Sequence, residues 1–202
     1  MRQASSRDVF RYWDRLRGTR AAPDRSEIDP GAIRASLPDV FLLARDAAYR
    51  YPFRLAGMSV CALFGRELRD SAFMALWSPD AAPVISSLVQ SVIDDSAGVV
   101  TGITGRNAEE QVLDLELLLL PLTCRDRVRA RVIGVLSAPQ QPYWLAIRPV
   151  LSLQSGDVRF VGPAVDNAAR KFVAGRDNPL RGPGFTVYPA DPRRPIPRNI
   201  QG

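Results

Sequence analysis

The chain has 202 residues, of which 46% are apolar, and a formal net charge of +6. This length and composition predict one globular domain with flanking segments. The sequence contains no histidine, and Lys171 is the only lysine among 27 basic residues. The lack of histidine excludes Ser-His-Asp and Cys-His catalysis, histidine-ligated haem and nearly every ordinary zinc site. No glycine-rich loop precedes Lys171, so a P-loop is excluded as well.

The sequence shows no sign of export or membrane insertion. No apolar run approaches the ~20 residues that cross a bilayer, and residues 1–10 lack the apolar region of a secretory signal. The cysteines, Cys61 and Cys124, fit a reducing compartment and are expected to be small buried side chains rather than a disulfide or a reactive thiol. We therefore expect a cytoplasmic protein. We expect no metal site, because no calcium-loop spacing is present either.

Positive charge is concentrated at both ends of the chain. Residues 1–25 carry seven arginines against three aspartates, and residues 170–202 carry seven basic residues against two aspartates. The centre of the chain is therefore mildly acidic. A dedicated nucleic-acid binder would show a basic face with interleaved aromatic residues or a readout helix. We do not expect nucleic acid as a specific partner, although the basic tail would attract phosphates weakly.

Residues 6–18 are predicted to form an amphipathic helix, with Ser6 as its N-cap and Gly18 as its stop. The apolar stripe of this helix consists of Val9, Phe10, Tyr12, Trp13 and Leu16. The stripe either packs on the domain or forms a dimerisation or partner surface. Helical turns are predicted over 30–36, where Asp29 serves as N-cap and Pro30 takes the first helical position.

Two short strands over 39–44 and 51–55 are predicted to form a hairpin, with Tyr51, Phe53 and Leu55 on one apolar face. Short helices over 58–96 follow, and Ser78-Pro79-Asp80 opens the longest of them.

The second half of the chain reads mainly as strands. Residues 99–104, 112–120 and 128–136 are predicted strands, and the second has the clearest alternation of apolar and polar residues. Residues 143–150 read as a further extended piece, and 151–161 as a short hairpin around Ser155-Gly156-Asp157.

This order predicts an α+β fold: an antiparallel five-stranded sheet with short helices on one face, preceded by an N-terminal amphipathic helix. We expect four parts. They are a helix and linker over 1–25, the sheet domain over 26–153, an extension over 154–173 and a disordered Pro- and Arg-rich tail over 174–202.

Six segments, in the right order along residues 9–153, resemble the compact PAS-domain family that is common in alphaproteobacteria as stand-alone proteins. The segments are Tyr12-Trp13 with Leu16-Arg17-Gly18, Arg25-Ser26-Glu27-Ile28-Asp29-Pro30, Leu37-Pro38 with Phe41-Leu42-Leu43, Phe53-Arg54-Leu55-Ala56-Gly57, Phe64-Gly65-Arg66-Glu67-Leu68, and Pro142-Tyr143-Trp144-Leu145.

The resemblance implies a non-catalytic sensory or protein-interaction module in bacterial signal transduction, with a protein partner or a second copy of itself. Its motif positions here are Arg17, Gly18, Asp29, Pro30, Arg54, Gly57, Gly65 and Arg66. The residues around Cys61 lack the N-C-R-F-L-Q-like run of flavin-binding light sensors, and haem would need a histidine. No cofactor is therefore predicted, and an unknown small molecule remains an option.

In such a fold, eight side chains would line a small pocket between the sheet and the helices. They are Phe53, Leu55, Cys61, Phe64, Phe73, Trp77, Leu88 and Leu117. The alternative is a packed core without a ligand. Arg54 and Arg66 would bind an acidic ligand only if they pointed inward.

Two more specific hypotheses, on second-messenger binding and on catalysis, have less support in the sequence. Arg125 and Arg129 have the R-x-x-x-R spacing found in receptors for nucleotide second messengers, but they lie in a predicted turn. The carboxylate pairs are Asp94-Asp95, Glu109-Glu110 and Asp114 with Glu116. General acid–base catalysis needs such groups in a cleft, and nothing in the sequence places them there, so we do not expect an enzyme.

Overall fold

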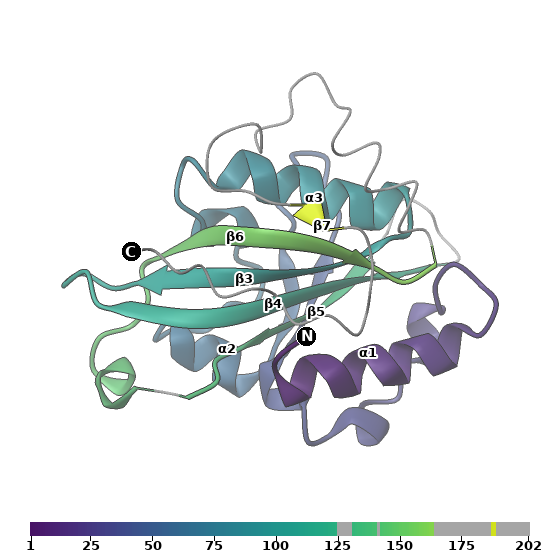
Figure 1. The fold of residues 1–202 in the computed structure, drawn as a ribbon, viewed down its shortest axis with the longest axis horizontal. Coiled ribbons are helices and arrows are strands. Elements are labelled where there is room, and N and C mark those ends of the chain that lie inside the picture. The colour runs from purple at the N-terminus through teal and green to yellow at the C-terminus, as the bar shows by residue number, and fades with distance from the viewer. Residues whose placement is uncertain (125–130, 141, 164–186, 189–202) are drawn as a thin grey trace.

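The predicted strands pair into one sheet. The computed structural model describes residues 1–124, 131–140, 142–163 and 187–188. Within these residues, seven strands form the sheet in the order β2-β1-β5-β4-β3-β6-β7 (Figure 1). Their bounds are β1 Val40–Ala44, β2 Phe53–Ala56, β3 Gly98–Arg106, β4 Val112–Leu122, β5 Arg131–Ser137, β6 Ser152–Val161 and β7 Val187–Tyr188. All neighbouring strands are antiparallel except β6 and β7, which are parallel.

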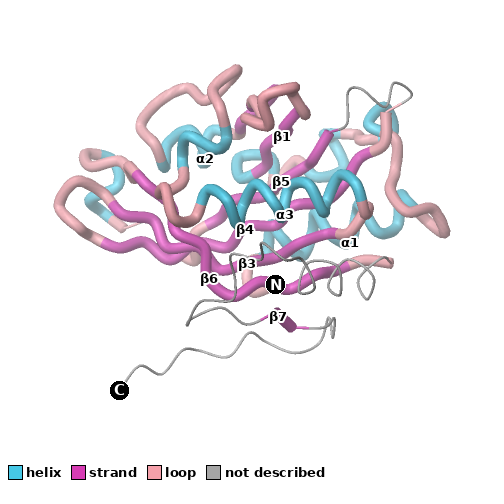
Figure 2. Tube along the Cα trace, turned by 90° about the horizontal axis from the view of Figure 1, so that it is seen from above, coloured by secondary structure: helices cyan, strands magenta, loops and turns pink. Residues whose placement is uncertain are grey.

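Helices cover both faces of the sheet (Figures 1 and 2). The α-helices are α1 Ala4–Arg17, α2 Met58–Leu63 and α3 Ala82–Asp94, and the 3-10 helices are η1 Arg25–Glu27, η2 Pro30–Ile33, η3 Leu37–Asp39, η4 Phe73–Leu76 and η6 Tyr143–Ala146. Helices α2 and α3 pack on what we call the inner face of the sheet, and α1 packs on the outer face. In the described part of the chain, no helix has the length and apolar character needed to cross a membrane.

Strand β4 shows why the sheet has two buried faces. Leu115 and Leu117 point into the inner cluster of apolar side chains, whereas Leu118 and Leu120 point into the outer cluster. Successive side chains of a strand point to opposite faces, so the apolar run in this strand fits a sheet covered on both sides. The α+β fold and the N-terminal helix are as predicted, but the outer face is covered and the sheet extends beyond five strands.

The predicted hairpin over 151–161 is wrong, because β6 is one continuous strand paired with β3. Thr101 lies opposite Val158 and Ile103 lies opposite Ser155, so two residues of β6 bulge against Gly102 alone. Sequence signals for a turn and for a β-bulge are similar, since both favour glycine and aspartate. The expected boundary at residue 153 therefore falls within a strand.

The extended piece predicted over 143–150 is also corrected, because this segment begins with the 3-10 helix η6. Pro142 precedes the helix as its N-cap residue, and its carbonyl accepts a hydrogen bond from the Leu145 amide at 3.1 Å. Trp144 and Leu145 are both buried. Anchoring two consecutive side chains in one core favours a helical turn over a strand, where they would point to opposite faces.

The start points of two helices differ from their predictions. Helix α1 begins after Gln3 rather than at Ser6, which is buried inside the helix. Helix α3 begins at Ala82, because the backbone of Ser78 accepts hydrogen bonds from Ala81 and Ala82 in a preceding turn. The predicted caps Asp29 and Gly18 are confirmed: the Asp29 side chain accepts from the Gly31 amide at 2.8 Å, and Gly18 ends α1 with a φ of 57°.

Several predictions fall outside the described residues. The first part of the strand predicted over 128–136 and the R-x-x-x-R turn of Arg125 and Arg129 belong to 125–130, which the structure does not describe. Within the predicted tail, only β7 is described, beside Val158 and Arg159 of β6.

Candidate functional site

The eight predicted pocket residues do not all lie together. Six of them belong to the inner cluster between the sheet and the helices: Phe53, Phe64, Phe73, Trp77, Leu88 and Leu117. Several aromatic rings in this cluster touch one another. The ring centroid of Phe73 lies 5.7 Å from that of Phe53 and 5.5 Å from that of Trp77. Cys61 is half-buried and packs against the same cluster.

Leu55 is the exception, and a β-bulge explains it. Leu42 lies opposite Leu55, but the next residue, Leu43, lies opposite Phe53, so Arg54 has no partner in β1. The extra residue reverses the alternation, and Leu55 faces the outer side of the sheet while Phe53 faces the inner side. The predicted shared face of Phe53 and Leu55 is therefore wrong.

The stripe on α1 packs within its own chain. Val9 and Trp13 are fully buried and Tyr12 nearly so, and Phe10 and Leu16 are partly buried against the same outer cluster. The Trp13 indole nitrogen donates a hydrogen bond to the Pro121 carbonyl at 2.8 Å. A partner could reach Val9, Tyr12 and Trp13 only if the helix left the sheet.

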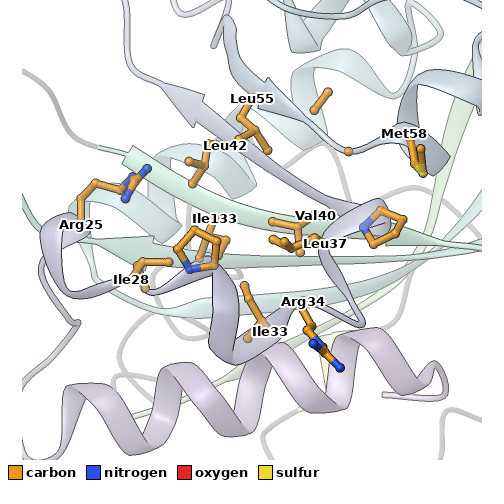
Figure 3. Close-up of a pocket in the computed structure, with 14 residues that line it drawn as sticks. Arg25, Ile28, Ile33, Arg34, Leu37, Val40, Leu42, Leu55, Met58 and Ile133 are labelled. Atoms are coloured by element: carbon orange, nitrogen blue, oxygen red, sulfur yellow. The ribbon is translucent and has the colours of Figure 1, made fainter.

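Leu55 lines a groove on the outer face that the sequence patterns did not predict (Figure 3). Its floor is formed by strands β1, β2 and β5 through Val40, Leu42, Leu55 and Ile133. The groove has a volume of about 450 Å³. This is within the range of about 300–1,000 Å³ that is usual for small-molecule sites.

The linker between α1 and β1 supplies the wall of this groove. Ile28, Ile33 and Leu37 point from the linker towards the strands (Figure 3). These three residues are apolar positions in an otherwise polar segment, and that spacing was the signal that could have located the groove. Arg25, Pro30, Arg34, Pro38, Ala56, Gly57 and Met58 complete the lining.

Local hydrogen bonds hold the wall in place. Asp24 and Glu27 form a reciprocal capping box around η1. The Tyr12 hydroxyl accepts a hydrogen bond from the Asp29 amide at 2.8 Å, which ties the linker to α1. Thr123, at the end of β4, donates its amide to the Pro23 carbonyl at 2.9 Å. The wall is therefore preformed rather than loose.

Gly57 is a motif position with a clear structural reason. A Cβ atom at this residue would lie 2.3 Å from the carbonyl oxygens of Leu37 and Pro38. Only glycine lets β2 continue into α2 this close to the linker. The residue is also part of the groove lining.

Other motif positions form surface ion pairs or lie in turns. The Arg17 side chain donates to Asp14 at 2.8 Å, and the Arg54 guanidinium pairs with Asp70 at 2.9 Å. Gly65 has a φ of 60° after α2. Arg54 and Arg66 are both exposed, so neither points into the inner cluster.

The charged side chains of the groove are both cationic. Arg25 is half-buried and Arg34 is exposed, and no acidic residue belongs to the lining. Within the described ranges, neither guanidinium takes part in an ion pair, whereas Arg20, Arg45 and Arg54 each pair with a carboxylate.

A second surface feature lies after β5, in the segment 143–151. Tyr143, Ile147 and Leu151 are 89%, 81% and 62% exposed. Two backbone hydrogen bonds attach the segment to α2 and β3. The Val150 amide donates to the Leu63 carbonyl at 2.8 Å, and the Leu151 amide donates to the Arg106 carbonyl at 2.8 Å. We call this stretch the exposed apolar segment.

The sheet is antiparallel from β2 to β6 and carries short helices on its inner face, which is an α+β arrangement. The family model for the PAS domain matches residues 1–137, and the chain belongs to this family. The match contains the whole groove and ends with β5, before the exposed apolar segment. No match was found among the curated proteins.

One solved structure that is similar to this chain is that of an RNA-binding light-oxygen-voltage receptor. The similarity covers 54% of this chain at 19% sequence identity and a TM-score of 0.41. It covers 33% of that receptor's chain, so this chain spans about a third of the receptor's length.

Proposed function

We propose that the chain is a non-catalytic PAS sensory module of bacterial signal transduction that acts through protein contacts at its exposed apolar segment. The observation that carries this proposal is the exposure of Tyr143, Ile147 and Leu151 within nine residues. Large apolar side chains that stay exposed within a short stretch of chain favour a protein-interaction site.

The segment is built like a docking surface. Trp144, Leu145 and Val150 are buried and anchor it to the core, while the exposed side chains stand between them. An anchored segment loses little conformational freedom when a partner binds, so more of the apolar burial contributes to affinity. The partner is a regulatory protein or a second copy of this chain.

The six motifs described above support the compact branch of the family that is common in alphaproteobacteria. The two cysteines, which fit a reducing compartment, support a cytoplasmic location. Among the described residues, no group of three or more His, Cys, Asp or Glu side chains gathers as a metal site would require. Asp94 lies in an ion pair with Arg45 at 2.9 Å, and Glu109 in one with Arg148 at 2.7 Å, so these carboxylates have surface roles.

A second candidate function is the binding of a small ligand, or a nucleotide second messenger, in the inner cluster. One observation favours it: the buried Trp77 indole nitrogen has no hydrogen-bond partner among the described residues. A buried donor without a partner costs free energy that a ligand acceptor would recover. Native mass spectrometry of the purified protein tests this candidate through the mass of any co-purified ligand.

The principal proposal is tested by replacing both Tyr143 and Ile147 with serine. Because both side chains are highly exposed, the variant should fold normally by circular dichroism. We expect it to lose self-association in sedimentation velocity, or to lose partners captured by the intact chain. Tyr49→Ser is a control, since Tyr49 is 43% exposed and lies between β1 and β2, outside the groove lining. Unchanged association and capture in the double variant would rule the proposal out.

A further inference from the structure

The groove on the outer face has the composition of a site for an alkyl chain. Its floor of Val40, Leu42 and Ile133 is aliphatic, and the linker adds Ile28 and Ile33 on the facing side. No aromatic ring or acidic side chain takes part in the lining. A methylene group occupies about the volume of a water molecule, about 30 Å³. The groove therefore has room for roughly 15 such groups.

Arg25 supplies the polar end of this site. Figure 3 shows its guanidinium at one end of the groove, turned towards the strands, with Met58 at the opposite end. Arg25 is half-buried, and in the described part of the chain it has no carboxylate partner. A half-buried guanidinium beside an apolar floor favours an anion, because charge-assisted hydrogen bonds strengthen where water is partly excluded. The Arg34 side chain points away from the floor.

We propose that this groove binds a free medium-chain fatty acid, with its carboxylate on Arg25 and its alkyl chain along the aliphatic floor towards Met58. The proposal goes beyond the proposed function and concerns a different surface. Failure of either one leaves the other standing.

Because the groove lies between the linker and the sheet, a bound ligand would also stabilise the fold. The alkyl chain would touch the linker wall and the strands at once, since Ile28 and Ile33 come from the linker and Leu42 and Leu55 from the sheet. A ligand that binds two packed elements stabilises their contact. The fatty acid would therefore stabilise the packing of the N-terminal segment on the outer face.

The test uses the full chain, with its methyl groups observed by NMR, and saturated fatty acids of 8, 10 and 12 carbons below their micelle concentrations. We expect shifts at Ile28, Ile33 and Ile133, and none at Leu88 or Leu117 of the inner cluster. Affinity should rise about fourfold per added methylene until the groove is full. Dodecanol, which lacks the carboxylate, should bind roughly tenfold more weakly than dodecanoic acid.

Two variants test whether Arg25 binds the carboxylate head group of the fatty acid. Arg25→Gln should weaken dodecanoic acid binding roughly tenfold and leave dodecanol unchanged. The matched control is Arg66→Gln, which removes an exposed charge outside the groove lining and should change neither affinity. The proposal is overturned by no binding, by shifts at Leu88 and Leu117 instead of the groove, or by equal affinity for the acid and the alcohol. A protein partner that shifts the Met58 methyl signal, where no fatty acid does, would overturn the proposal as well.

Discussion

Trp13 in the N-terminal helix donates a hydrogen bond from its indole nitrogen to the carbonyl of Pro121, at the end of β4, over 2.8 Å. Both groups are buried. The Arg17 guanidinium lies over the same indole, 5.5 Å from its ring centroid. This bond joins residues 108 positions apart and attaches α1 to the centre of the sheet. It makes the helix part of the folded domain rather than an appendage.

The first prediction concerns this bond. Trp13→Phe leaves the Pro121 carbonyl without its donor, whereas Trp77→Phe removes an indole nitrogen that has no partner among the described residues. Both substitutions remove part of a buried ring, so their difference reflects the hydrogen bond of Trp13 together with the unpaired N–H of Trp77. Trp13→Phe should cost about 1–3 kcal/mol more free energy of unfolding than Trp77→Phe. Urea denaturation measures both, and equal costs would show that the bond contributes nothing.

The second prediction concerns the start of α1. The buried Glu116 carboxylate accepts hydrogen bonds from the amides of Arg2 and Gln3, at 2.6 and 3.2 Å. A carboxylate at a helix N-terminus also interacts favourably with the helix dipole. Glu116→Gln should therefore lower the free energy of unfolding by about 1–3 kcal/mol. Asp114→Asn, at an exposed position of the same strand, should change it by less than about 0.5 kcal/mol. Similar values for the two variants would contradict the capping role.

The third prediction concerns Gly57, where the linker lies against the end of β2. Gly57→Ala places a Cβ atom 2.3 Å from two carbonyl oxygens, which forces the backbone apart. We expect a loss of about 1–3 kcal/mol in stability. Gly102→Ala is the matched control, because nothing lies within 4 Å of a Cβ atom there. A Gly57→Ala variant as stable as Gly102→Ala would mean that the linker does not lie against β2 as described.

The fourth prediction concerns Cys61. Burial raises the pKa of the Cys61 thiol, and the negative charge of Glu67, whose Oε1 lies 3.6 Å from Sγ, raises it further. Because the thiolate is the reactive form, iodoacetamide should modify Cys61 slowly at neutral pH and faster as pH rises towards this raised pKa. Glu67→Gln lowers the thiol pKa, so the rate at pH 7 should rise by roughly twofold or more.

Mass spectrometry of the peptide that contains Cys61 measures this rate. Asp80→Asn serves as the control, since Asp80 is an exposed carboxylate far along the chain from the thiol. A rate that is the same in Glu67→Gln and Asp80→Asn would refute the electrostatic influence of Glu67.

Local patterns in the sequence predict most elements of this fold. The apolar stripe of α1, the Asp29 cap and the alternation in β4 depend on neighbours within a few residues, and all three agree with the structure. The bulge at Arg54 does not depend on such neighbours. It is set by how β2 pairs with β1, and strand register is decided by contacts between segments that are distant in sequence.

The candidate site was harder to predict for a related reason. In the sequence, the strands and inner helices indicate a pocket that includes both Leu55 and Phe53, but the bulge places these two residues on opposite faces. The groove depends on where the linker residues Ile28 and Ile33 lie against the outer face. That placement follows from the docking of α1 and from contacts such as the one between Tyr12 and Asp29. None of these contacts can be predicted from the helical or strand periodicity of a single segment.

The central claim is that this PAS module acts through direct protein contact at the exposed apolar segment. The most direct measurement replaces Tyr143 with the photo-crosslinking residue benzoylphenylalanine in cells that carry the protein, with Tyr49 as an exposed tyrosine control on a different surface. We predict a discrete crosslinked protein species from position 143 that is absent from position 49. Crosslinks of equal yield and identity from both positions, or none from position 143, would contradict the claim.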